Sequence, residues 1–260
     1  MNDSAIKSGI HPLRRVLLQA VLLAGVIAQA PCAFGESETQ LWGNLILGFD
    51  IGERWGMETD IEPKVLVSGG DAWRNLDVKQ IFEYYPNRSF DLVGEIVGGY
   101  THQFEDVDTT ELTERIGVRV NLLHNLREMM DRSTQGLGRI SLAVLTRLEH
   151  RTFWYSNGGG TDDDWRLRMR FETKGGINNA DMSQDGTLYG LFDVEYYWAL
   201  SDELEERFTS KARARAGLGY RINSGCRVEL LYQRDWERDL PGDEPQADAN
   251  IIDMRVKLFF

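Results

Sequence analysis

The sequence predicts an all-β chain that closes into an antiparallel transmembrane β-barrel. Long runs of alternating apolar and charged residues favour this fold class, as does an N-terminal segment of the export type. The last run, residues 250–260, alternates most clearly. Its apolar face consists of Ile252, Met254, Val256, Leu258 and Phe260, and its charged face of Asp253, Arg255 and Lys257. Two such faces fit a membrane barrel, with lipid outside and a polar lumen inside.

Residues 1–35 are predicted to be a signal peptide that is removed on export. The basic residues Lys7, Arg14 and Arg15 precede an apolar run at 16–28, which is too short to cross a bilayer as a helix. An uncleaved membrane anchor is the alternative interpretation of this segment.

The small residues Ala33 and Gly35, one residue apart, place the cleavage site after Gly35. Residues 36–260 then form a single outer-membrane barrel domain. Cys226 is the one cysteine in this part of the sequence, so no intramolecular disulfide can form.

Eleven runs are long enough to be membrane-crossing strands, which need about 9–11 residues each. They lie at 41–51, 55–67, 74–85, 90–101, 111–122, 139–152, 163–173, 187–198, 208–222, 226–237 and 250–260. Because single-chain bacterial barrels have an even number of strands, we expect about twelve strands, with ten as the alternative. A twelfth strand would lie within 123–138 or 174–186.

Alternation alone leaves the sidedness of the barrel open, because a soluble barrel would carry its charged rows outside. The export segment, the terminal Phe260 and a set of aromatic residues near strand ends favour lipid outside. The aromatic set is Trp42, Trp55, Tyr84, Tyr100, Trp165, Trp198, Tyr220, Tyr232 and Trp236.

The connections between the runs fall into two kinds. Residues 86–88 and 223–225 read as tight turns and are assigned to the periplasmic side. The longer acidic connections are assigned to the extracellular side, and they lie at 102–110, 153–163, 199–207 and 238–249.

Charged residues at inward-facing positions are predicted to form a network in the lumen. Its members are Arg166, Arg168, Arg170, Glu172, Asp193, Glu195, Lys211, Arg213, Arg215, Arg227, Glu229, Asp253, Arg255 and Lys257. The acidic pair Asp193 and Glu195 falls between two basic rows, so neighbouring strands would neutralise one another. We interpret the network as structural. The alternative is a selectivity lining or an anion site, since arginine suits planar anions.

The sequence offers no convincing catalytic pair. Outer-membrane lipid hydrolases place Ser and His together on the outer face of a strand. Ser156 follows His150 by six residues, which is about 20 Å along an extended strand. We therefore predict a protein that is not an enzyme. The acidic loop at 157–164 lacks the spaced ligands of a defined metal motif, so we predict a solvated loop, and calcium binding through its carboxylates is the alternative. No cofactor is expected.

Several short segments share a characteristic sequence pattern. They are residues 165–172, 192–197, 213–221 and 230–233, together with Leu41-Trp42 and Glu83-Tyr-Tyr-Pro-Asn87. This pattern resembles an uncharacterised bacterial family of outer-membrane β-barrel proteins, a domain of unknown function. The resemblance covers most of the mature chain and implies a transmembrane barrel. It implies no activity, substrate or catalytic residue.

The expected function is that of an integral outer-membrane barrel, either a narrow or plugged channel or a structural barrel. An outer-membrane lipid hydrolase of the phospholipase or deacylase type is one alternative, and a soluble periplasmic β-barrel binding protein is another. The expected partners are outer-membrane lipid, lipopolysaccharide and the barrel assembly machinery, which would recognise the last strand through Phe260. A net charge of −12 argues against nucleic acid as a partner.

Overall fold

The structure is a computed structural model, and it describes residues 37–69, 72–104, 107–123, 140–179, 181–201, 212–237 and 246–260. The predicted signal peptide at 1–35 lies outside these ranges. Among the described residues, no helix is long and apolar enough to cross a membrane.

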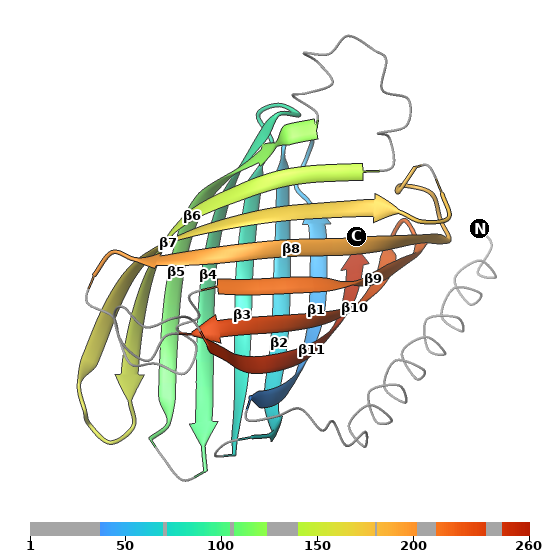
Figure 1. Cartoon of the computed structure of the whole chain (residues 1–260). Coiled ribbons are helices and arrows are strands. Elements are labelled where there is room, and N and C mark those ends of the chain that lie inside the picture. The colour runs from blue at the N-terminus through green and yellow to red at the C-terminus, as the bar shows by residue number, and fades with distance from the viewer. Residues whose placement is uncertain are drawn as a thin grey trace, which may run out of the picture. The chain divides into compact units, whose positions relative to one another are not determined.

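Eleven strands form a closed barrel in the described part of the chain (Figure 1). They are β1 (Glu38–Asp50), β2 (Trp55–Ser68), β3 (Trp73–Tyr84), β4 (Phe90–Gln103), β5 (Thr109–Asn121), β6 (Ile140–Tyr155), β7 (Thr161–Gly176), β8 (Thr187–Ala199), β9 (Ala212–Asn223), β10 (Cys226–Glu237) and β11 (Gln246–Phe259). Each predicted run corresponds to one of them. Consecutive strands pair antiparallel, and β1 closes the barrel by pairing parallel with β11.

The expected number of about twelve strands, or ten, is wrong: the barrel has eleven in the residues described. The even-number rule fails because the β1–β11 pair is parallel, from Glu38 opposite Ala249 to Gly48 opposite Phe259. No additional strand separates β5 from β6 or β7 from β8, since both pairs are hydrogen-bonded directly. Parallel closure also means that β1 begins at the opposite end of the barrel from Phe260.

The two predicted tight turns lie at the end of the barrel that holds Phe260, here called the C-terminal end. In each turn an asparagine side chain accepts a backbone N–H, at 2.8 Å between Asn87 and Ser89 and at 2.9 Å between Asn223 and Gly225. The β5–β6 and β7–β8 connections join strands at this end as well. The four longer acidic connections join strand ends at the other end, where β1 begins.

The outer wall of the barrel is apolar. Ile116 has an exposed fraction of 67%, Leu218 of 54% and Val78 of 45%, all at outward positions. Of the aromatic residues expected near strand ends, Trp55, Tyr100, Trp165, Trp198, Tyr220 and Tyr232 are exposed. Trp42 is an exception, since it is buried in a small apolar cluster with Ala249 and Ile251. Its position alternates with outward-facing neighbours on β1, which places its ring inside the barrel.

Candidate functional site: the charged lumen

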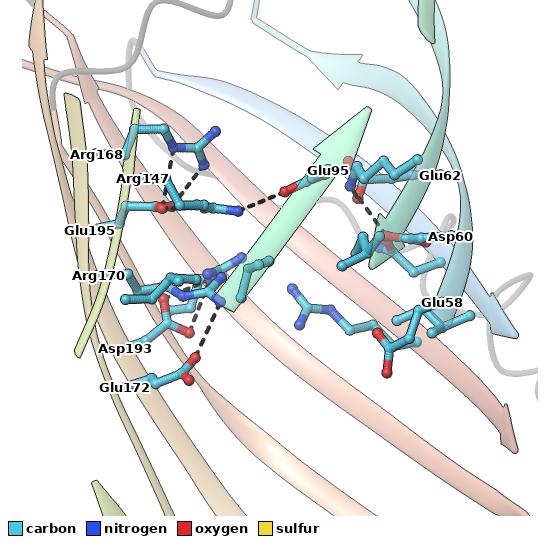
Figure 2. Close-up of a pocket in the computed structure, with 18 of the residues that line it drawn as sticks. Glu58, Asp60, Glu62, Glu95, Arg147, Arg168, Arg170, Glu172, Asp193 and Glu195 are labelled. Carbon is cyan, nitrogen blue, oxygen red and sulfur yellow. Dashed lines mark hydrogen bonds and ion pairs between the residues drawn. The ribbon is translucent and has the colours of Figure 1, made fainter. Parts of the chain in front are cut away.

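The lumen holds a cavity of about 530 Å³ that is lined mainly by charged side chains (Figure 2). Among the described residues, fifteen lysines and arginines and twelve aspartates and glutamates line it. Successive inward positions of a strand lie on the same face, and these positions carry the charged member of each alternating run. The same pattern that makes the outer wall apolar therefore fills the lumen with charge.

Six side chains from β4 to β8 close a ring of alternating charge. In order around the ring they are Glu95, Arg115, Glu149, Arg168, Glu195 and Arg147. Arg147 of β6 donates to Glu95 of β4 at 2.9 Å and to Glu195 of β8 at 2.7 Å. One side chain therefore links strands on both sides of its own neighbours, which requires it to project over them into the lumen.

The other links of the ring are also direct hydrogen bonds. Arg168 donates to Glu149 at 2.6 Å and to Glu195 at 3.1 Å. Arg115 donates to Glu95 at 2.5 Å and to Glu149. Glu149 has a side-chain exposure of 0% and Glu195 of 1%. Buried carboxylates of this kind are tolerated only when they are paired and hydrogen-bonded, and the ring satisfies both requirements.

Tyr197 and Arg166 support the ring from one side. The Tyr197 hydroxyl donates to Glu195 at 3.0 Å and accepts from Arg168 at 3.2 Å. The guanidinium groups of Arg166 and Arg168 lie over its aromatic ring, at 4.9 Å and 4.6 Å from the centroid. Arg166 also donates to Glu149. These contacts fix the orientation of the arginines that complete the ring.

A second network lies on β2 and β3. Lys64 binds Asp77 at 2.5 Å and Glu62 at 3.0 Å, and Lys79 binds Asp60 at 3.3 Å and also Glu62. The resulting series of ion pairs alternates in charge from Asp77 through Lys64, Glu62 and Lys79 to Asp60. Its two lysines are the only cations that these strands and β4 contribute to the cavity lining, among the residues described.

The lumen is therefore divided into two walls of unlike charge. Strands β2–β4 contribute seven carboxylates and two lysines to the described lining, whereas β6–β9 contribute eight cations and three carboxylates. Figure 2 shows Glu58, Asp60 and Glu62 on one side and the arginines of β6 and β7 on the other. Arg147 spans the space between these walls through its bond to Glu95.

Most residues of the predicted lumen network line the cavity. These are Arg166, Arg168, Arg170, Glu172, Asp193, Glu195, Arg213, Arg215, Arg227, Glu229, Arg255 and Lys257. Asp253 is fully buried behind the lining, where it accepts hydrogen bonds from Asn44 at 2.8 Å and from Arg255 at 2.5 Å. Lys211 lies outside the described residues.

The acidic row on β8 forms ion pairs with the basic rows of both neighbouring strands, β7 and β9, although not always with the residues directly opposite. Asp193 pairs with Arg215 of β9 at 2.8 Å. Glu195 lies opposite Arg170 and Arg213 in the strand register, yet its carboxylate binds Arg147 and Arg168. Long arginine side chains reach diagonal partners, so direct register does not determine the ion pairs.

Four ring members were not among the predicted site residues: Glu95, Arg115, Arg147 and Glu149. The sequence does contain a signal for some of them. Arg147, Glu149 and Arg151 occupy alternate positions of one predicted run, which is the same pattern that indicates Arg166, Arg168 and Arg170. Glu95 has no such neighbours, and only the tertiary structure brings it to Arg147.

His150, considered above as a catalytic residue, lies in β6, and Ser156 directly follows the last residue of that strand. His150 lies 3.8 Å from Glu114 and 3.5 Å from Asp163, and its ring packs against Trp165 at 4.5 Å between centroids. The Ser156 backbone N–H donates to the Asp108 carbonyl at 3.0 Å. Within the described ranges, no three His, Cys, Asp or Glu side chains are grouped so as to hold a metal ion.

Phe260 is tied to the first strand at the C-terminal end of the barrel. Its ring stacks on Phe49 with centroids 5.2 Å apart, and its N–H donates to the Gly48 carbonyl at 3.0 Å. Phe260 has an exposed fraction of 72%, whereas the neighbouring Phe259 points into the lumen. The terminal residue therefore lies on the seam between the first and last strands.

Comparison with known families gives a match over residues 39–245 to the family described as Protein of unknown function (DUF2490). Comparison with curated proteins gives no match. The family match starts in β1 and extends to the connection before β11, so it includes all the strands that build the ring. Because it covers most of the chain, the protein belongs to this DUF2490 family of unknown function.

Proposed function

We propose that the protein is an integral barrel of the bacterial outer membrane whose lumen is occluded by its own ion pairs. The observation that carries this proposal is the sidedness of the wall. Large apolar residues such as Ile116 and Leu218 are exposed, and charged residues such as Glu149 and Glu195 are buried. A soluble barrel of this composition would expose its charges and bury its apolar side chains. Lipid is the surrounding in which the observed arrangement is stable.

Closure and strand length support the same proposal. A spanning sheet must leave no unpaired edge in the hydrocarbon region, and the parallel β1–β11 pair removes the remaining edge. The strands are 12 to 16 residues long, which exceeds the roughly 9–11 residues that a tilted strand needs to cross. Outer-membrane lipid and lipopolysaccharide would cover the apolar wall.

The lumen favours a narrow or plugged barrel over an open pore. Side chains fill much of the interior of a barrel of this size, and Arg147 with its partners projects across the lumen from β6. The two oppositely charged walls attract each other, so the lumen is not lined by charges of one sign. We assign the protein a structural or narrowly conducting role, without catalysis.

The C-terminal end is assigned to the periplasm, where the assembly machinery would recognise β11 through Phe260. In this orientation β1 begins at the extracellular end, together with the acidic connections.

Membrane extraction tests the proposal. Envelopes of expressing cells are washed with high salt and then with urea, and the pellet is analysed by electrophoresis with and without heating. An integral barrel stays in the pellet and migrates faster when unheated. Release of folded protein by salt would identify a soluble periplasmic barrel instead.

A further inference from the structure

Three cations stand side by side at the C-terminal end of the lumen. Arg227 of β10 lies directly opposite Lys257 of β11 and directly opposite Arg221 of β9. All three occupy inward positions, and we call them the cation row. Directly opposed residues have Cβ atoms roughly 5 Å apart, and like charges in such pairs are destabilising. A fourth cation, Lys174 of β7, lies within electrostatic range of Lys257.

The carboxylates nearby are unevenly shared among these four cations. Glu229 lies 3.3 Å from Lys257, but it also lies 3.9 Å from Arg255 and accepts a hydrogen bond from Tyr189. Asp185 reaches Arg221 only at 3.8 Å, and its side chain is 65% exposed to solvent. Neither Arg227 nor Lys174 makes an ion pair with any residue that the structure describes. Glu58 lies within electrostatic range of Arg227, Lys257 and Lys174, and Glu172 within range of Lys174. Arg227 and Lys174 are therefore cations near carboxylates that do not bind them, within the part of the chain that the structure describes.

Hydrogen-bond donors of the cation row are buried without acceptors. The Nε atoms of Arg221 and Arg227 are inaccessible and make no hydrogen bond within the described chain. The Nε atom of Arg147 in the ring is buried without an acceptor as well, but the other guanidinium nitrogens of Arg147 donate to two carboxylates. The Arg227 side chain makes no hydrogen bond with any described residue, and it lines the cavity. A donor without an acceptor costs free energy, so the guanidinium of Arg227 has room for an acceptor that the described chain does not supply.

The row is also held in place. The Arg227 guanidinium lies over the Phe259 ring at 4.7 Å, and a side chain at Gly48 would collide with the same ring, at 2.9 Å from one of its atoms. Phe259 is thus seated over Gly48 on the neighbouring strand. Arg227 has little freedom to find another partner on this wall of the barrel.

We propose that the cation row and Lys174 bind an oxyanion of the phosphate class inside the lumen. Arginine presents paired N–H donors that match phosphate oxygens, and lysine adds charge without a fixed direction. An anion placed among the four side chains reduces their repulsion and gives Arg227 and Lys174 the partner that they lack among the described residues. Lys174, Arg227 and Lys257 line the cavity of about 530 Å³, which is large enough for a phosphate ester. The site does not depend on whether the barrel spans a membrane.

Arg227 lies two residues after the β9–β10 turn, at the C-terminal end of the barrel. Phosphate chemistry could reach it from two sources. One is a dissolved phosphate or phosphate monoester, and the other is the headgroup of an anionic lipid. Because the four side chains point into the lumen and not onto the apolar wall, we commit to the dissolved species.

Thermal unfolding of the purified barrel in a non-ionic detergent tests the site. The probes are inorganic phosphate and glycerol phosphate, compared with chloride at equal ionic strength, and phosphatidylglycerol in mixed micelles is a separate arm. A ligand that binds only the folded state raises the midpoint as its concentration rises. We expect both phosphates to raise it and chloride to have little effect. Stabilisation by the lipid alone would overturn the proposal of a dissolved ligand.

The variants Arg227→Gln and Lys257→Gln should weaken phosphate binding about ten- to hundred-fold, as expected for loss of a charged hydrogen-bonding partner. Arg88→Gln is the matched control, since Arg88 is an exposed residue in the β3–β4 turn at the same end. Without phosphate, Arg227→Gln should unfold at a higher temperature than the wild type, because it relieves repulsion. A purely structural arginine would lower the midpoint in both buffers. That result, or an equal phosphate effect in all variants, would overturn the site.

Discussion

Gly117 lies directly opposite Arg147 in the β5–β6 register, and the missing side chain at Gly117 leaves the space through which Arg147 reaches Glu95. A Cβ atom at Gly117 would be 2.6 Å from Arg147 Cγ and in collision with the Thr146 carbonyl oxygen. The ring of alternating charge therefore depends on the absence of a side chain at Gly117, a residue that is not itself a member of the ring.

Gly117→Ala should destabilise the barrel by about 1–3 kcal/mol, the range for overpacking a tight site. Urea titration of the refolded protein measures the loss. Gly98→Ala on β4 is the matched control, because a Cβ there meets no atom within 4 Å. Equal stability of the two variants would mean that Gly117 does not make room for Arg147.

Arg147 and Glu195 should be energetically coupled. Arg147→Met leaves Glu95 and Glu195 each with fewer partners, and breaking a buried pair in this way costs about 3–5 kcal/mol. The double variant with Glu195→Gln should recover about 0.5–3 kcal/mol of the summed losses, as residues in one network do. Strict additivity in refolding titrations would show that the charges are hydrated independently and that no ring exists.

The apolar wall gives a prediction about the surrounding solvent. Ile116→Arg places a charge at the most exposed of the large apolar side chains within the described strands. In a bilayer this should cost about 2–4 kcal/mol if the position lies near the midplane. Glu114→Arg, two positions nearer the rim on the same face, is the control and should cost less. A neutral effect of Ile116→Arg on folding into vesicles would indicate that water surrounds the wall.

Phe260 is expected to act in assembly beyond its contact with Phe49. Deleting Phe260 should reduce the heat-modifiable folded form in outer membranes. Phe49→Leu removes the same aromatic stacking but leaves the terminal residue in place, so it should reduce the folded form less. If both variants fold equally well in cells, Phe260 contributes only packing.

The β4–β5 connection should loosen in acid. The Tyr100 hydroxyl donates to Asp108 at 2.7 Å and the Gln103 N–H at 3.0 Å, and these bonds lower the pKa of Asp108 below its usual value. The stabilisation is therefore complete above the unfolded pKa of about 3.9. It is lost as the pH falls through the lower folded value. Amide exchange at Gln103 measures the loosening, and Asp108→Asn should abolish its pH dependence.

The strand pattern was predictable because alternation is a local property of the sequence. Each run from 41–51 to 250–260 contains its own two faces, and all eleven are strands. The closure was not predictable, because nothing in β1 or β11 alone states whether they meet parallel or antiparallel. The predicted strand number therefore relied on the assumption that barrels have an even number of strands, and this assumption was wrong.

The site was predictable only where charges alternate within a run. The alternate spacing of Arg166, Arg168 and Arg170 predicts that they share one face. The ion-pair partner of each arginine depends instead on how far its side chain reaches. Glu195 bonds to Arg147 and not to Arg213, which lies directly opposite it. Glu95 and Gly117 belong to the site through contacts with residues on other strands. The alternation within one run of the sequence does not predict such contacts.

Conductance in planar bilayers tests most directly whether the ion pairs occlude the lumen. The wild-type barrel should carry little or no current at neutral pH. The variant Arg147→Ala, which removes the side chain spanning the two walls, should carry more under the same voltage and salt. A wild-type current equal to that of Arg147→Ala would contradict occlusion by the ring and identify an open, water-filled pore.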